Sequence, residues 1–193
     1  MGNRVHRETP RADAVLALLE EPSTLPIPTG WEGLTAKEPH DWRDTMEQLG
    51  RESVVALAIE AVRQLGLPIW EDRHPGDVRP QRALEAASMC LSNPGPNARR
   101  FAQVAAKGCS AARKATIGYG HRIAESARAV ANAAERSDSG AAIEAALLAV
   151  AHLEDHLAYE FAIDAVYGKE AQIRRAILGV AARPSSDRRP GGS

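Results

Sequence analysis

Aromatic side chains are scarce in this chain: tryptophan, tyrosine and phenylalanine together make up 4% of its 193 residues. A core built on large rings is therefore excluded. Hydrophobic residues still account for 44% of the chain, so the interior must be filled mainly by Ala, Leu, Val and Ile. Small side chains let helix axes approach closely but bury little area each, so stability must come from many contacts.

Cysteine and net charge are also low. Cys90 and Cys109 are the only two cysteines, and two thiols in a chain of this size do not form a disulfide framework. We interpret them as buried helical cysteines of a protein in a reducing cytosol. The formal net charge is −1, whereas a nucleic-acid binder needs a basic excess to displace counterions. Nucleic acid is therefore not expected as the default partner.

Long hydrophobic runs are missing as well. No window approaches the ~18 consecutive apolar residues of a membrane span. Residues 1–14 are polar and lack the apolar segment of a signal peptide. The sequence therefore predicts a cytoplasmic protein that makes no contact with a membrane.

What the chain has is helical periodicity, because apolar residues recur every three or four positions and no segment alternates convincingly with period two. Glycine and proline breaks separate the predicted helices, which span residues 11–21, 41–49, 51–65, 67–73, 79–91, 98–115, 121–135, 140–167 and 169–180. Residues 41–49 and 51–65 fit either two helices or one, Gly66 is the predicted stop after residue 65, and Asn97 is the predicted cap of the helix over 98–115.

These segments predict an all-α, single-domain, antiparallel bundle of about 6–8 helices over residues 41–180. An amino-terminal extension, residues 1–40, holds a short helix and a proline-rich loop, and residues 181–193 have the composition of a disordered tail. The predicted inward faces comprise Phe101, Val104, Ala105, Cys109 and Ala112; then Ile123, Ala127, Val130 and Ala134; then Ile143, Leu147, Val150, Leu153, Leu157 and Phe161.

The least generic stretch is residues 67–87, which combines dense mixed charge with a proline-opened helix. We name eight of its side chains the charged corner and take them as the candidate binding surface: Trp70, Glu71, Asp72, Arg73, Asp77, Arg79, Arg82 and Glu85. Mixed charge of this kind serves either to tether a turn or to select a partner.

Tethering is the favoured interpretation for part of the charged corner. We expect Asp77 and Arg79 to tie the turn and Arg82 to pair with Glu85 at i, i+3. For Glu71, Asp72 and Arg73 both interpretations stay open. Packing in the core, or of a loop on the core, is favoured over an interface for the three tryptophans, Trp31, Trp42 and Trp70. The basic pairs at 99–100, 113–114 and 174–175 are interpreted as solvated helix faces and carboxylate partners rather than a groove.

A second constellation has metal-ligand spacing. His152, His156 and Glu160 follow one another at i, i+4, i+8, and His121 with Glu125 from a neighbouring helix would complete a four-ligand site. The histidine pair lacks the glutamate of a zinc protease, and no Glu-x-x-His recurs as in di-iron bundles. Half-buried imidazoles that hydrogen-bond across helices are the favoured interpretation, so no metal, cofactor or catalytic residue is predicted.

Three motifs carry a family resemblance: LPIWE at residues 67–71, PGDVRP at 75–80 and ALEA at 83–86. Together with the later AVAHLEDHLAYEFA segment, which holds His152 and His156, they resemble the alanine-rich immunity proteins of bacterial polymorphic-toxin systems over about residues 50–180. The chain departs from that pattern at Gly76 and Val78, where an acidic run is usual, and at Gln81, where a basic residue is expected.

The resemblance implies a non-enzymatic protein that inhibits a cognate toxin by occluding it, with the charged corner choosing the partner and Trp70 as an aromatic anchor. Two alternatives remain. One is a metal-dependent enzyme centred on His121, His152, His156 and Glu160. The other is a helical scaffold or adaptor subunit, in which the loop over residues 22–40 wraps a partner and self-association is open.

Overall fold

The computed structural model describes residues 43–116, 120–161, 173 and 175–179, without the side chains of Arg43, Glu160 and Phe161. These residues are almost entirely helical and contain no strand, which confirms the predicted all-α bundle. Several predictions lie outside the described residues: the helix over 11–21, the loop over 22–40 with Trp31, Trp42, the end of the helix predicted to reach 167, most of the segment 169–180 and the tail.

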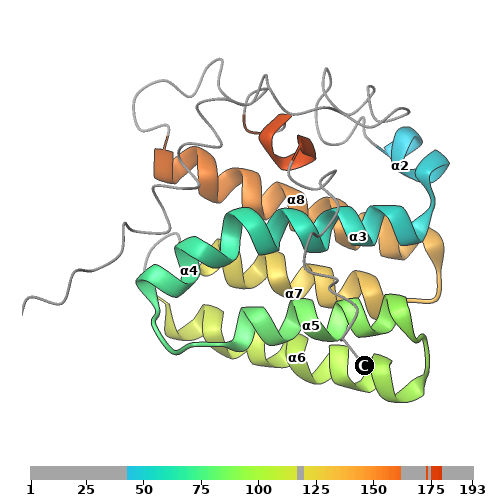
Figure 1. Cartoon of the computed structure of the whole chain (residues 1–193), viewed down its shortest axis with the longest axis horizontal. Helices are drawn as coiled ribbons and strands as arrows, with labels where there is room; N and C mark the ends of the chain where they lie inside the picture. Colours follow the sequence, from blue (N-terminus) through green and yellow to red (C-terminus); the bar gives the residue numbers. More distant parts are fainter. Residues whose placement is uncertain (1–42, 117–119, 162–172, 174, 180–193) are drawn as a thin grey trace, which may run out of the picture.

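The helices follow one another along the chain as α2 (Arg43–Leu49), α3 (Arg51–Ala61), the π-helical turn η4 (Val62–Gly66), α4 (Leu67–Arg73), α5 (Arg79–Ser92), α6 (Pro96–Ala115), α7 (His121–Glu135) and α8 (Ser139–Phe161). Successive long helices run antiparallel beside one another. Helix α7 lies in the middle, with α3 and α8 on one side and α5 and α6 on the other (Figure 1). Thus α5 and α6 form the outer layer of one side of the described bundle.

Glycine acts differently at two positions of the first helical stretch. Gly50 has a φ of 79° and separates α2 from α3, so residues 43–61 form two helices rather than one. Gly66 does not end a helix, and the predicted stop there was wrong. The chain continues through η4, where the Leu67 N–H bonds the Val62 carbonyl, directly into α4. Pro68 explains the wider turn, because its ring would clash with a normally placed carbonyl four residues earlier.

Close helix packing depends on small residues. A Cβ at Gly66 would lie 3.4 Å from Leu153 Cδ1 and 3.5 Å from Ile123 Cγ2, so glycine lets η4 sit directly against α7 and α8. The central α7 buries six alanines along its length, which lets neighbours approach on every side. Its predicted inward residues Ile123, Ala127, Val130 and Ala134 are all buried, as are Ile143, Val150, Leu153 and Leu157 of α8, with Leu147 partly buried.

The predicted inward face of α6 is confirmed at Cys109 and Ala112, with Ala105 partly buried, and was wrong at Phe101 and Val104. Phe101 and Val104 are 59% and 60% exposed, while the buried stripe consists of Ala98, Ala102, Ala106, Cys109 and Ala112. Alanines fit the narrow space against α7, and the larger side chains are turned outward. The start of α6 also differs, because Gly95 is the N-cap and Pro96 the first residue, which places Asn97 inside the first turn.

The continuous helix Arg51–Arg73 is long and apolar enough to cross a membrane by length and mean hydropathy, at 23 residues and 1.3 in its most apolar window. In the structure 67% of that window is buried inside the bundle. Burial against other helices accounts for such an apolar helix without a bilayer. The cytoplasmic location remains a prediction.

Candidate functional site

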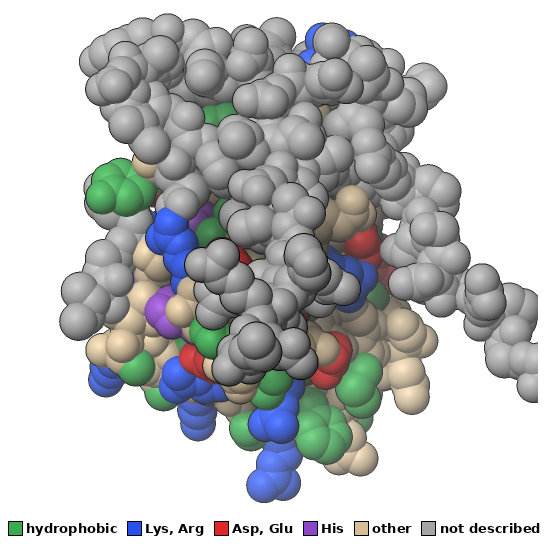
Figure 2. Space-filling model, turned by 60° about the vertical axis from the view of Figure 1, so that its left-hand side comes forward, with side chains coloured by type: hydrophobic (Ala, Val, Ile, Leu, Met, Phe, Trp, Pro, Cys, Tyr) green, Lys and Arg blue, Asp and Glu red, His purple; other side chains and the backbone are tan. Residues whose placement is uncertain are grey.

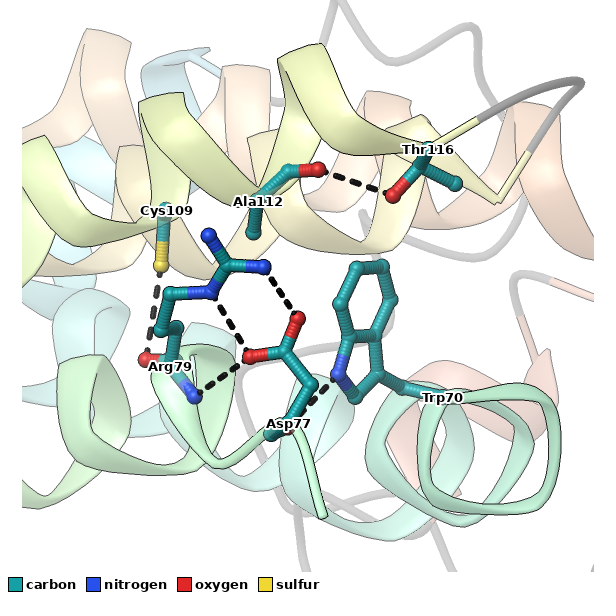
Figure 3. A network of polar contacts seen from close by, with 6 residues as sticks. All are labelled: Trp70, Asp77, Arg79, Cys109, Ala112 and Thr116. Carbon is teal, nitrogen blue, oxygen red and sulfur yellow. Dashed lines mark hydrogen bonds and ion pairs between the residues drawn. The ribbon is translucent and has the colours of Figure 1, made fainter. Parts of the chain in front are cut away.

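Trp70 forms the inside of the charged corner. Its side chain is 1% exposed, and its Nε1–H donates to the Asp77 carbonyl oxygen at 2.8 Å (Figure 3). The His74 ring stacks obliquely beside it, with centroids 4.2 Å apart. The indole thus contributes buried area and joins α4 to the turn before α5. The core interpretation of Trp70 is confirmed, and its predicted role as a surface anchor was wrong.

Asp77 and Arg79 tie that turn as predicted. Asp77 Oδ1 accepts hydrogen bonds from Arg79 N at 3.2 Å and Arg79 Nε at 2.8 Å, and Oδ2 accepts one from Nη2 at 2.5 Å (Figure 3). The hydrogen bond from Arg79 holds the pKa of Asp77 below its ordinary value, against the opposing effect of partial burial. Gly76, with a φ of 86°, allows the reversal that brings the carboxylate to the start of α5.

Helix α6 packs against the corner from the far side. The Cys109 thiol donates to the Arg79 carbonyl oxygen at 3.6 Å, and burial raises the pKa of Cys109 to about 12. Burial also raises the pKa of Cys90. Both cysteines are buried and free, as predicted, and neither forms the thiolate that a nucleophile needs at neutral pH.

The rest of the charged corner is spread over two grooves, which share Glu85, and the exposed end of α4. The predicted pair of Arg82 with Glu85 does not form, because Glu85 Oε1 accepts from Gln81 Nε2 at 2.9 Å instead. The Arg82 side chain is exposed and has no hydrogen bond or ion pair within the described residues. Asp72 and Arg73 are exposed at the end of α4, while Glu71 and Glu85 line a groove of about 260 Å³ formed by η4, α4 and α5.

A larger groove runs between α5 and α6, and we name it the α5–α6 groove. It has a volume of about 390 Å³ and is lined by Arg79, Arg82, Glu85, Ala86, Met89, Phe101, Val104, Ala105 and Gly108. Met89 is 50% exposed, Phe101 59% and Val104 60%, so its walls present large apolar side chains to solvent. Exposed apolar surface with a polar rim is typical of interaction sites.

Helix α6 is also the most one-sided in charge. It carries Arg99, Arg100, Lys107, Arg113 and Lys114 and no acidic residue, although the whole chain has a net charge of −1. Of these, Arg113 binds Glu125 at 3.0 Å, the kind of carboxylate partner that was predicted. The other four are exposed and make no ion pair within the described part of the chain. Basic and apolar side chains lie side by side at the lower end of the molecule, where α5 and α6 run (Figure 2).

The histidine constellation forms a polar cluster between α7 and α8. Glu125 is buried between Arg113 and Arg122, and its Oε2 lies 3.8 Å from His152 Nδ1. Arg122 Nη1 lies 3.0 Å from the same imidazole nitrogen, which must accept because a guanidinium only donates. Burial lowers the pKa of His152, with Glu125 opposing, and the bond from Arg122 agrees with a neutral ring.

This geometry is that of an inter-helix hydrogen bond, as the favoured interpretation predicted for His152. Among the described residues, no three His, Cys, Asp or Glu side chains are grouped as metal ligands. His156 is fully buried on α8, His121 begins α7, and the side chain of Glu160 lies outside the description. The guanidinium of Arg122 beside His152 would repel a bound cation.

Comparison of the chain with protein-family models, with curated proteins and with solved structures finds no match. The resemblance to immunity proteins therefore stays a prediction.

Sequence reasoning missed the α5–α6 groove, although two signals for it were present. The first is a second periodic stripe on α6, at 98, 102, 106, 109 and 112, which consists of small residues. The second is the absence of acidic residues from 96 to 115, since an isolated basic helix has no carboxylates of its own to pair with.

Proposed function

We propose that this chain is a non-enzymatic protein-binding module, and that it inhibits a toxin of a bacterial polymorphic-toxin system by covering it. The observation that carries the binding role is the α5–α6 groove, where Met89, Phe101 and Val104 stand at least half exposed on otherwise well-packed helices. Large apolar side chains in one groove gain free energy when a partner removes them from water. The toxin as partner rests on the resemblance alone.

The tied turn of the charged corner supports this role because it holds the start of α5 in place. Asp77, Arg79 and Trp70 fix the start of α5, and α5 supplies one wall of the groove. A wall held by buried contacts keeps its shape when free, so little conformational entropy is lost on binding. Occlusion by a preformed helical surface then follows without any chemical step.

The test begins with co-purification of the full chain and the product of the adjacent reading frame. We expect a stable complex, and we expect co-expression of this chain to rescue cells from the neighbour's toxicity. Phe101→Ser should weaken both effects, whereas Leu148→Ser should not, because Leu148 is 47% exposed on α8, far from the groove in sequence and fold. A neighbour that is neither toxic nor bound would contradict the proposal.

A further inference from the structure

We infer that the α5–α6 groove takes an acidic amphipathic helix of the partner, with its apolar side between α5 and α6 and its carboxylates against Arg82, Arg100 and Lys107. This rests on the proposed function only in that both require a protein partner. The inference adds the secondary structure and the charge of the partner's binding surface.

The shape of the groove favours a helix as the occupant. Both walls are helical stripes: Arg82, Glu85, Ala86 and Met89 on α5, and Phe101, Val104, Ala105 and Gly108 on α6, each at i, i+3, i+4, i+7. At 1.5 Å per residue each stripe is about 10 Å long, or two helical turns. A third helix laid along such a pair presents its own i, i+3, i+4, i+7 side chains to the floor.

Glycine keeps one end of the floor open. A Cβ at Gly108 would meet only Arg79 Cγ, at 3.9 Å, so the space above Gly108 is unfilled. A partner side chain can enter there, about two helical turns along α6 from the exposed Phe101 ring. Gly108 thus differs from Gly66, where neighbouring side chains already occupy the space.

The charges indicate the sign of the partner. Arg100, Val104 and Lys107 share one exposed stripe of α6, at i, i+4, i+7, so two cations flank Val104 along that helix, and Lys107 also lines a second groove between α6 and α7. Arg82 stands on the opposite wall, and none of these three cations is ion-paired within the described residues. The one carboxylate that lines the groove belongs to Glu85, which accepts a hydrogen bond from the Gln81 amide. An apolar floor between cations complements an apolar stripe flanked by carboxylates.

Two other occupants fit less well. A second copy of this chain, docked by two-fold symmetry, would bring the Arg100 and Lys107 side chains of one α6 near those of the other. Nucleic acid would use the cations but would gain little from Met89, Phe101 and Val104, since phosphates offer no apolar surface. Both remain outcomes of the experiment.

The probe is a synthetic helical peptide of about 18 residues, long enough for a stable helix, with leucines at i, i+3, i+4, i+7 and glutamates on both flanks. The matched peptide carries lysine in place of every glutamate. Each is titrated against the full chain by fluorescence anisotropy. We expect the acidic peptide to bind at least about tenfold more tightly, and this preference to shrink as salt is raised.

Variants then locate the site. Phe101→Ser should abolish measurable peptide binding, and Arg82→Glu with Arg100→Glu should remove the preference for the acidic peptide. Leu148→Ser is the control that should bind like the parent chain. The inference is overturned if neither peptide binds, if both bind equally, if duplex DNA competes with the acidic peptide, or if Phe101→Ser instead abolishes a dimer seen by light scattering.

The two proposals can fail separately. A chain that still neutralises its neighbour's toxicity after Phe101→Ser and both charge reversals would keep the proposed function and lose the acidic-helix site. A chain that prefers the acidic peptide but has no toxic neighbour would lose the toxin as partner and keep the site.

Discussion

The tied turn of the charged corner, formed by Trp70, Asp77 and Arg79, lies next to the α6 wall of the α5–α6 groove, yet the polar groups of the two regions are arranged in opposite ways. In the corner, Trp70 is buried with its N–H bonded, and both oxygens of Asp77 accept hydrogen bonds from Arg79. On the α6 wall of the groove, Phe101 is largely exposed, and Arg100 beside it in sequence makes no ion pair within the described residues. The adjacent pair of Asp77 and Arg79 therefore serves internal structure, while Arg82 of the charged corner and the basic helix α6 present the free surface.

This difference has a physical cause. Opposite charges close together in sequence can satisfy each other locally, as Asp77 and Arg79 do across a two-residue separation. Cations on a helix without acidic residues have no such local partner, so they remain solvated until another molecule supplies one. The following experiments test whether the two regions are as separate in function as they are in bonding.

Truncation of Trp70 should have the largest effect on stability. Trp70→Ala removes a buried ring and leaves a cavity, so we expect the free energy of unfolding to fall by about 3–5 kcal/mol. Trp70→Phe keeps most of the apolar contact but leaves the Asp77 carbonyl without its donor, at a cost of about 1–2 kcal/mol. Urea denaturation measures both. Equal losses in the two variants would contradict the role assigned to the indole N–H.

Asp77→Asn should cost less, about 1 kcal/mol, because the Asp77–Arg79 pair is partly exposed and therefore screened. The effect should depend on pH. Since the pKa of Asp77 is lowered in the folded state, its stabilisation is present above the ordinary pKa of aspartate, about 3.9, and is lost as pH falls through the folded value. Unfolding curves of parent and variant should converge in acid. Asp72→Asn, at an exposed position, is the control and should change the free energy of unfolding little.

Glycine substitutions compare an open site with a closed one. Gly108→Ala should raise the free energy of unfolding by about 0.5–1 kcal/mol, because alanine is the better helix former and its Cβ meets nothing closer than 3.9 Å. Gly66→Ala should gain less stability, since its Cβ would be in close van der Waals contact with Val62 and Leu153 at 3.4 Å and leaves no free space to fill. Thermal melts of the two variants test this order. A gain at Gly66 that matched the gain at Gly108 would contradict the described packing.

The buried cluster around Glu125 offers a smaller, pH-dependent test. Burial lowers the pKa of His152, so its neutral form stabilises the fold above the ordinary histidine value of about 6.5, and this is lost as pH falls. His152→Gln retains an acceptor for Arg122 but does not titrate. We expect the parent chain to lose stability relative to this variant as pH falls through the ordinary histidine pKa of about 6.5 and on through the lower folded value, measured by chemical denaturation. A relative gain of the parent in acid would mean that Glu125 outweighs burial.

Phe101→Ser should change the stability least. The ring is 59% exposed, so its loss should alter the free energy of unfolding by no more than about 0.5 kcal/mol. The same variant is expected to lose binding, which separates the groove from the corner most sharply. A large loss of stability would show that Phe101 belongs to the core, as its periodicity first suggested.

Much of the fold could be predicted from local sequence. Glycine and proline positions and the recurrence of apolar residues predicted α5, α7 and most of α8 to within a few residues, because capping, breaking and amphipathicity act over one or two turns. The Asp77–Arg79 tether was predictable for the same reason, since both partners lie within three residues.

The site depended on information that no single helix contains. Two stripes of α6 fit the helical period, one with Phe101 and Val104 and one with alanines, and periodicity cannot choose between them. The choice follows from the narrow space against the alanine-rich α7, which admits only the smaller stripe and leaves the larger residues facing water. Likewise, Gly66 continues a helix because Leu153 and Ile123, distant in sequence, pack directly on it.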